Sequence, residues 1–365
     1  MTAQTMVREA GLPEPDEVIA ERATTLHVIQ GGPCLIAFVA ELARTESAHT
    51  LLVGTRADEC LARSLGLDPV AAFAPPFGEL TLAIRSWRRL LKLVQAEYPS
   101  IESATCWSTS CAAATVRAMP RWDVALASAG GPEPGVATAL MARFVSFRPG
   151  AALAMTEAGA SASRAFVDNE VTVIRPTVRQ SLLHRNREKI RRRWWASERE
   201  IMVGLLGEPA DAADARRASD IVGIAAVRGL KTRLLIHPES SRANRTLQWI
   251  SEVDVPSFIG IEQALARPWE VVAGLDAAIV LRDSLTVAGG ASRTSRLLRC
   301  GSETSISPLP ACWAAEAGVP ILAERGALDD GLAAQLRAFV FDADDPLSAT
   351  RELLAVAKRS GVTPR

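Results

Sequence analysis

Residues 25–43 read TLHVIQGGPCLIAFVAELA, and this stretch decides the fold class. The segment before the two glycines is short and rich in apolar residues, which is typical of a buried strand. Gly31, Gly32 and Pro33 interrupt it, and the apolar residues that follow recur with the spacing of a helix. A strand joined to a helix by a glycine turn is the repeating unit of a parallel sheet covered by helices.

The same alternation of strand and helix continues along the chain. Further strands of the first series are expected at 49–54, 70–75, 103–107, 122–128 and 171–178. Pro176 ends the last of them, and the alternation restarts at residue 200. Strands of the second series are expected at 200–207, 233–238, 255–260, 276–283 and 319–324. We therefore expect two parallel α/β halves of similar size, with the boundary near residue 179.

The bulk composition is that of an ordinary globular protein. Of the 365 residues, 48% are hydrophobic and 22% are charged, and 41 basic residues balance 41 acidic ones. A chain without net charge has no chain-wide field to gather nucleic acid, so we expect no nucleic-acid partner. The six cysteines form no C-x-x-C pair and the four histidines are not spaced like zinc ligands. We expect reduced thiols and no metal site.

The N-terminus and the hydropathy pattern bear on localisation. Residues 1–22 form a polar tail without the apolar segment that a signal peptide has. No apolar run reaches the ~20 residues that cross a membrane. We expect a cytoplasmic protein, attached to a membrane surface at most.

Five motifs in order resemble one known family. They are LHVIQGG (26–32), VTVIRPTV (171–178), WEVVAGLDAAIVL (269–281), AAEAGVPILAE (314–324) and FVFDADDPLSATRELL (339–354). With these motifs in this order, the chain resembles the GT-B glycosyltransferases of the "group 1" type, which use nucleotide sugars and are generally retaining.

The resemblance implies an α/β fold with two Rossmann-like parallel-sheet domains facing a cleft. Residues 23–178 would form the acceptor domain and residues 179–345 the donor domain, and the helix within 346–365 can cross back to the first domain. The resemblance also implies a nucleotide sugar as substrate and no further cofactor. The sugar would pass to an unknown acceptor, which can be lipid-linked, in polysaccharide biosynthesis.

The sequence departs from the family pattern where the family carries its chemistry. The family has a Glu-x7-Glu pair, and counting back from Gly318 places Trp313 and Ser305 there. The arginine that follows the first strand of the second domain corresponds to Leu205. Two functions therefore stay open: an active glycosyltransferase, or a catalytically inactive GT-B-fold protein that binds or acts as a scaffold. A GT-B epimerase is a third.

The pyrophosphate of a nucleotide sugar needs cations or free backbone N–H groups. Gly31 and Gly32 precede a helix and let the backbone approach an anion, although a tight strand-to-helix turn explains them equally well. Cations follow two strands of the second half. The alternative is ordinary surface charge for the first group and a solvated flexible loop for the second. They are Arg242 and Arg245 after the strand at 233–238, and Arg293, Arg296 and Arg299 in the loop 290–302.

We expect a nucleotide at the carboxyl edge of the second sheet, near His237, the loop 290–302 and Gly318, because ligands gather at that edge of open parallel sheets. Acid–base chemistry needs an imidazole or a carboxylate there. The candidates are His237, whose alternative is a structural role, and Glu316, one turn from the place of the family's glutamate.

Two acidic residues after the strand at 319–324 are further candidates. Asp329 and Asp330 fall where the family often has an acidic residue that touches the donor. Their other interpretation is helix capping, since an aspartate oxygen accepts the free N–H groups of a first turn.

Residues 184–195 read HRNREKIRRRWW, the strongest concentration of charge in the chain. Cations followed by paired tryptophans suit the interface of an anionic membrane, so peripheral membrane contact is one interpretation. The other is a helix that connects the domains, with both tryptophans packed inward.

Overall fold

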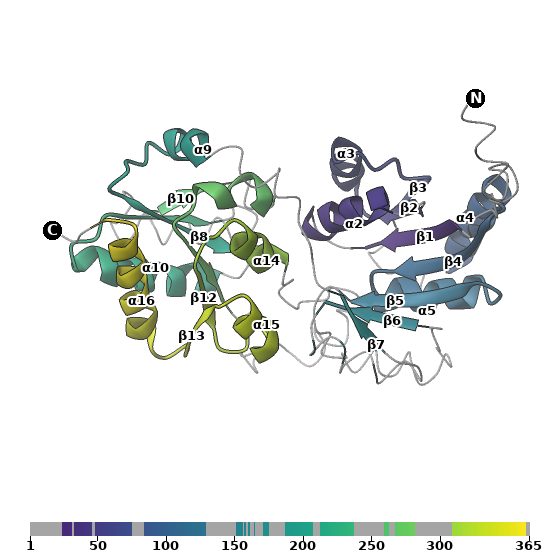
Figure 1. Cartoon of the computed structure of the whole chain (residues 1–365). Coiled ribbons are helices and arrows are strands. Elements are labelled where there is room, and N and C mark those ends of the chain that lie inside the picture. Colours follow the sequence, from purple (N-terminus) through teal and green to yellow (C-terminus); the bar gives the residue numbers. More distant parts are fainter. Residues whose placement is uncertain are drawn as a thin grey trace, which may run out of the picture.

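The computed structural model contains two parallel sheets that follow one another along the chain. It describes residues 24–30, 33–45, 48–74, 84–128, 151–155, 157, 160, 164, 171–174, 187–206, 212–236, 259–262, 267–281 and 309–362. Figure 1 shows the first sheet and its helices on the right, in purple to blue, and the second on the left, in teal to yellow. The fold class predicted from the sequence is confirmed.

The first sheet has seven strands in the order β3-β2-β1-β4-β5-β6-β7, all paired in parallel. They are β1 (Thr24–Ile29), β2 (Ala48–Val53), β3 (Ala71–Phe73), β4 (Ile101–Cys106), β5 (Asp123–Ser128), β6 (Ala151–Ala154) and β7 (Val171–Val173). The helices between them are α2 (Pro33–Thr45), α3 (Arg56–Ser64), α4 (Ile84–Glu97) and α5 (Thr109–Ala118). The order reverses at β1, so successive helices cover both faces, as in doubly wound folds.

Local sequence explains where these helices begin. Thr55 accepts the backbone N–H of Asp58, whose carboxylate accepts the Thr55 N–H at 2.7 Å, and this capping box starts α3. Ser108 caps α5 by accepting the backbone N–H of Cys111 at 3.1 Å. Both caps directly follow a strand or its turn, which keeps the strand-to-helix connections short.

The second sheet has six strands in the order β10-β9-β8-β11-β12-β13, again all parallel. They are β8 (Ile201–Leu206), β9 (Thr232–Ile236), β10 (Ile259–Ile261), β11 (Ala277–Val280), β12 (Ile321–Glu324) and β13 (Phe339–Phe341). The helical elements are α9 (Arg187–Arg193), α10 (Ala212–Val227), η3 (Pro268–Glu270), η4 (Val272–Gly274), α14 (Leu309–Glu316), α15 (Asp330–Gln335) and α16 (Pro346–Arg359).

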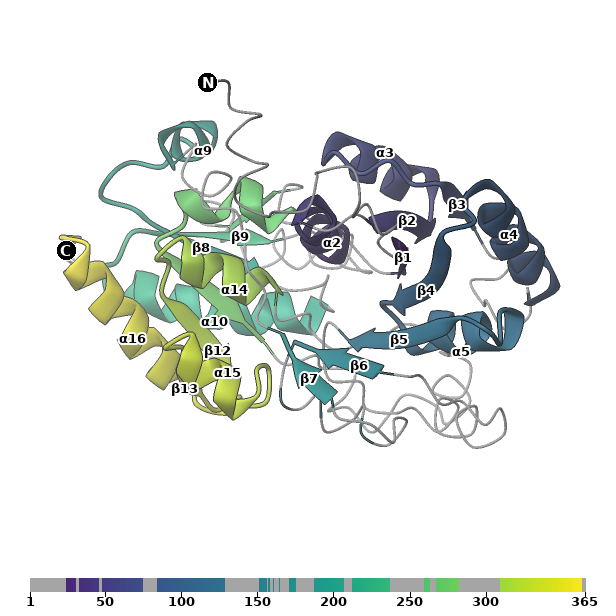
Figure 2. The ribbon, with the colours of Figure 1, turned by 45° about the vertical axis from the view of Figure 1, so that its right-hand side comes forward.

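The two halves touch through helices α2 and α14. One apolar cluster runs from the first half into the second and includes Ile36 and Phe38 of α2 and Leu309 and Trp313 of α14. Figure 2 shows α2 lying between its own sheet and the second half. The arrowheads of β4 and β5 point toward the second half, so the carboxyl edge of the first sheet faces it (Figure 1).

The final helix stays with the second sheet. Helix α16 packs on α10 and β13, and Leu353 and Val356 are fully or almost fully buried there. The return to the first domain that the resemblance allowed is not seen in α16 as far as Arg359. The predicted boundary at 178/179 lies outside the described residues and stays a prediction. Helix α9, from Arg187 on, packs on η4 of the second half.

A buried carboxylate joins α9 to the second sheet. Asp276 directly precedes β11 and accepts hydrogen bonds from Arg187 at 2.5 Å, from Arg191 at 2.7 Å and from the backbone N–H of Met202 at 2.8 Å. Arg191 itself is buried and also donates to the carbonyl oxygens of Ser197 and Glu200. The charges compensate each other away from water, which makes each of them necessary to the others.

We predict that Asp276→Ala lowers the free energy of unfolding by about 3–5 kcal/mol, because it leaves the Arg191 guanidinium buried without its carboxylate. The matched control is Asp342→Ala, which removes an ion pair to Arg325 in which both side chains are more than half exposed. That variant should lose at most about 1 kcal/mol. Urea unfolding followed by tryptophan fluorescence measures both, and equal losses would contradict the prediction.

Candidate functional site

The carboxyl edge of the second sheet is the expected place for a ligand, because strands that run in parallel all end there and free helix N-termini meet it. The strands end at Leu206, Ile236, Val280 and Glu324. Helix α10 follows β8 and therefore begins at this edge. Helix α14 leads into β12, so it begins at the carboxyl edge and ends at the opposite, amino edge.

A buried ion pair lies at this edge. Glu324, the last residue of β12, has a side chain only 2% exposed and is paired with Arg217 of α10, whose side chain is 27% exposed. A buried carboxylate must be paired to remain charged, and the pairing orients the guanidinium. Arg217 is thus a partly exposed cation held in a defined position where a phosphate would need one.

A second pair lies beside it on the surface. Arg325 directly follows β12 and donates to Asp342, which directly follows β13, at 2.6 Å. The hydrogen bond to Asp342 and its charge raise the pKa of Arg325 above its usual value. Both side chains are well exposed, so this pair adds charge to the edge without fixing much structure.

One of the two predicted acidic candidates after β12 caps a helix. Asp329 is the N-cap of α15, and its side chain accepts the backbone N–H of Leu332 at 2.7 Å. Asp330 is an exposed residue of the first turn. The capping interpretation therefore holds for Asp329, and contact with a donor stays a prediction for both.

The corresponding edge of the first sheet is tied together by one side chain. Gln30 directly follows β1, and its amide oxygen accepts from the Ser108 hydroxyl at 2.8 Å and from the Cys111 thiol at 3.1 Å. Ser108 and Cys111 belong to the start of α5, and both are buried. This network fixes the backbone on either side of the edge that faces the second half.

Two of the predicted residues lie at the wrong edge. Glu316 is the exposed last residue of α14, and Gly318 forms the turn before β12 with a φ of +72°. Both are therefore at the amino edge, and the expectation that Gly318 lies with His237 at the carboxyl edge is wrong. The helix runs antiparallel to the strands, so its C-terminal end lies away from the carboxyl edge. The other candidates lie outside the described residues: Gly31, Gly32, His237, Arg242, Arg245, Arg293, Arg296 and Arg299.

Trp313 occupies the place of the family's glutamate as a core residue. It is 2% exposed, and its ring lies edge-on to that of Trp269 in η3, with 5.1 Å between the centroids. Its indole N–H can only donate, so it cannot replace a carboxylate that accepts sugar hydroxyls. Leu205 is an inner residue of β8 and likewise brings no charge.

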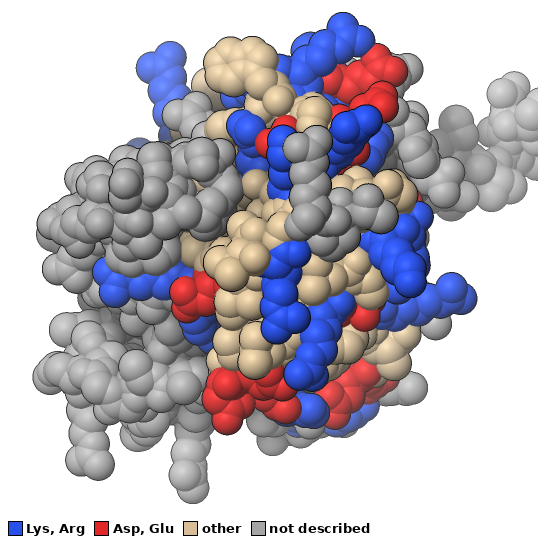
Figure 3. All heavy atoms as spheres, turned by 90° about the vertical axis from the view of Figure 1, so that its left-hand side faces the viewer, with Lys and Arg blue, Asp and Glu red and all other residues tan. Residues whose placement is uncertain are grey.

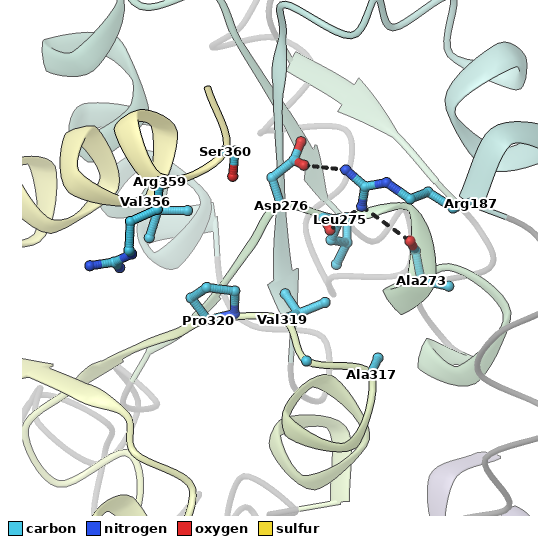
Figure 4. Close-up of a pocket in the computed structure, with 11 residues that line it drawn as sticks. Arg187, Ala273, Leu275, Asp276, Ala317, Val319, Pro320, Val356, Arg359 and Ser360 are labelled. Atoms are coloured by element: carbon cyan, nitrogen blue, oxygen red, sulfur yellow. Dashed lines mark hydrogen bonds and ion pairs between the residues drawn. The ribbon is translucent and has the colours of Figure 1, made fainter. Parts of the chain in front are cut away.

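A pocket of about 420 Å³ opens at the amino edge, between η4, α14 and α16 (Figure 4). Arg187 reaches across it to Asp276 and to the carbonyl oxygen of Ala273, and Val319 and Pro320 form another side. Three polar groups that line the pocket, the Arg187 guanidinium, the Asp276 carboxylate and the Ala273 carbonyl, are thus bonded to one another. The pocket lies at the amino ends of the strands, and the carboxyl edge is at their opposite ends.

The basic segment is largely committed to contacts within the second half. Arg193 pairs with the fully buried Glu262 at 3.1 Å, and the Trp194 indole donates to the same carboxylate at 2.8 Å. Figure 3 shows basic and acidic side chains side by side at the top of this end of the molecule. The packed interpretation holds for Trp194 but not for Trp195, which is 87% exposed with a φ of 46°.

Two of the described cysteines are poor nucleophiles because they are buried. Burial raises the pKa of Cys106 to about 12 and that of Cys312 to about 12, so both thiols stay protonated at neutral pH. Among the described residues no cluster of His, Cys, Asp and Glu is arranged to hold a metal ion. Within the same residues no helix is both long and apolar enough to cross a membrane.

Sequence reasoning missed Arg217 and Glu324. A charged residue at the end of an otherwise apolar strand was the available signal for Glu324 in VPILAE. For Arg217 there was none, because its partner is 107 positions away.

The comparisons with known proteins find similar structures and no similar sequence. No family model matches the chain, and no curated protein does. HepE of Anabaena, solved with UDP and glucose, has a TM-score of 0.64 at 14% identity, over 93% of this chain and 91% of that one. Sucrose-phosphate synthase of Thermosynechococcus elongatus has a TM-score of 0.64 at 10% identity, over 94% and 91%.

A glycosyltransferase from Rickettsia africae gives a TM-score of 0.63 at 10% identity, over 93% of this chain and 89% of that one. These TM-scores show a common fold. Identities this low leave the chemistry to be argued from the residues. The overlap spans both halves of each protein, so the likeness extends to the two-domain architecture. The chain has the GT-B fold of these glycosyltransferases, as its sequence motifs predicted.

Proposed function

We propose that the protein binds a nucleotide sugar at the carboxyl edge of the second sheet and transfers the sugar to an acceptor held by the first domain. The observation that carries the proposal is Arg217, a partly exposed cation oriented by the buried Glu324 at that edge. The GT-B fold supports it, since HepE was solved with UDP and with UDP-glucose.

The proposed chemistry follows from the charge of the donor. A departing nucleoside diphosphate gains negative charge as the sugar leaves, and a fixed guanidinium stabilises that charge better than mobile water does. Arg217 would donate to the diphosphate while Glu324 keeps it oriented. Helix α10 begins at the same edge, and its N-terminal dipole favours an anion there. The arginines of loop 290–302, with Arg242 and Arg245, would add cations.

The acceptor belongs to the first domain in this proposal. The edge fixed by Gln30 and Ser108 faces the second half, and Gly31 and Gly32 follow Gln30 in the chain. His237 remains the proposed acid–base group, because in the sequence it comes directly after Ile236, the last residue of β9. No cofactor beyond the nucleotide sugar is proposed. Transfer to a polysaccharide or lipid-linked acceptor in the cytoplasm is the corresponding cellular role.

One observation favours a second candidate function. Trp313 fills the place of the family's glutamate and packs into the core against Trp269. A protein with this substitution can keep the donor site and lose transfer, which would leave a nucleotide-sugar-binding or scaffold protein.

A panel of nucleotides and nucleotide sugars tests the proposal and separates the two functions. A ligand that binds only the folded state, present at 100 times its Kd, stabilises the protein by about 2.7 kcal/mol and raises the melting temperature. We expect uridine or another nucleoside diphosphate and its sugars to do so. Release of free nucleotide from the stabilising donor indicates a transferase, and binding without release indicates the second function. No stabilisation by any member would overturn both.

We predict that Arg217→Lys lowers the affinity for the stabilising nucleotide by about 10-fold. Lysine keeps the positive charge but cannot make the forked contact to a carboxylate and a phosphate at once. Isothermal titration measures the Kd. The double variant Arg217→Ala/Glu324→Gln removes both charges together, so it leaves no buried unpaired carboxylate and should weaken binding further.

The matched control is Arg228→Ala, which removes an exposed arginine just past the other end of α10. It should leave affinity and melting temperature unchanged, because it lies at the amino edge. Wild-type affinity in both Arg217 variants, with the fold intact by circular dichroism, would remove this pair from the site.

We predict that replacing Arg293, Arg296 and Arg299 together by alanine weakens nucleotide binding and flattens its dependence on salt. Cations that contact phosphates lose their effect as ionic strength rises, so removing them removes that sensitivity. Titrations at low and high sodium chloride measure the effect. An unchanged salt slope would exclude the loop from the site.

A further inference from the structure

Helix α4 of the first domain carries a row of exposed cations. Its sequence, IRSWRRLLKLVQAE, contains four basic residues, and all four are exposed: Arg85, Arg88, Arg89 and Lys92. Its one acidic residue is Glu97, at the last position. The helix therefore has an excess positive charge in a chain whose net charge is zero.

The cations lie on the outward face because the apolar residues occupy the other one. Trp87, Leu91 and Val94 are buried and, at spacings of four and three, share one side of the helix. Arg85, Arg89 and Lys92 follow the same spacing on the opposite side, where successive side chains are neighbours. Like charges so close together destabilise an isolated helix, so packing against the core must hold them in place.

These cations have no partners in the part of the chain that the structure describes. Arg85, Arg89 and Lys92 make no hydrogen bond or ion pair with the described residues, in contrast to the α9 arginines, which pair with Asp276, Glu188 and Glu262. The segment with the greater charge in the sequence is thus largely neutralised within the fold, whereas α4 presents its charge to solvent.

An exposed apolar side chain lies next to the cations of α4. Leu93 is 60% exposed, directly after Lys92 and four positions after Arg89. An exposed leucine next to cations gains nothing from a nucleic acid, and no exposed aromatic residue of α4 could stack on a base. At a lipid surface the leucine can enter the boundary between headgroups and acyl chains while the cations meet anionic headgroups.

We propose that α4 docks the protein on an anionic lipid surface. Helix α4 packs with α5, whereas α2, on the opposite face of the first sheet, makes the contact with the second half. Docking through α4 therefore leaves the α2–α14 contact and the edge that faces the second half uncovered. The proposal is independent of the identity of the donor.

Vesicle flotation with the full chain tests the proposal. We expect the protein to float with vesicles in which about one lipid in three is phosphatidylglycerol, and not with phosphatidylcholine alone. Binding should fall as salt rises. The variant Arg85→Gln/Arg89→Gln/Lys92→Gln should bind about 100-fold more weakly, since each basic residue near the surface contributes roughly a factor of five. The three side chains are exposed and unpaired, so its melting temperature should match that of the wild type.

The matched control is Lys189→Gln/Arg192→Gln/Arg199→Gln, which removes three exposed cations on and after α9. It should float like the wild type, and loss of binding in this variant instead would place the docking surface at α9. Leu93→Ser should weaken binding to anionic vesicles without changing its salt dependence. Equal binding to neutral and anionic vesicles would overturn the proposal. It would also be overturned if the protein bound no vesicles but bound a single-stranded oligonucleotide, and only the α4 variant lost that binding.

Discussion

The contact between α2 and α14 is the constraint on which the arrangement of this molecule depends. Each helix begins at the carboxyl edge of its own sheet, and their apolar side chains share one cluster. Burying that surface brings the two edges toward each other, which is where parallel sheets expose helix N-termini and loop backbone. The position of the candidate site is thus a consequence of apolar packing, before any polar residue is considered.

Buried ion pairs hold the helices of the second half to its sheet. Three carboxylates, Asp276, Glu262 and Glu324, are buried, and each is paired with an arginine from a distant segment. A buried carboxylate is costly unless it is paired, so these pairs fix helices α9 and α10 to the sheet. The pair at the carboxyl edge leaves the Arg217 side chain 27% exposed, at the place where a ligand is proposed to bind. The pairs of Asp276 and Glu262 connect α9 to the second sheet, and Asp276 with Arg187 lines the amino-edge pocket.

The fold was predictable because its signals are local. Apolar strands such as 26–29 alternate with amphipathic helices, and the positions of glycine, proline and capping residues mark the ends. The candidate site was predictable only in part. The edge follows from strand direction, but Gly318 was assigned to the wrong end of its strand. Proximity to a motif in sequence does not say which end of a helix lies at the carboxyl edge. Trp313 could be aligned with a glutamate, but only its contact with Trp269 shows that it belongs to the core.

By itself the sequence determined the α/β class, the two parallel halves, the GT-B resemblance and the absence of the family's glutamates at the matching positions. Only the tertiary structure decided which charged side chains are paired and which are exposed to solvent. The pairing of Arg217 with Glu324 and of Arg191 with Asp276 joins residues 107 and 85 positions apart. The tertiary structure also decided that the arginines of α9 are paired with carboxylates, whereas the cations of α4 face solvent. Secondary structure depends on neighbours along the chain, whereas the effect of a charge depends on its distance in space from its partner and on the water around it.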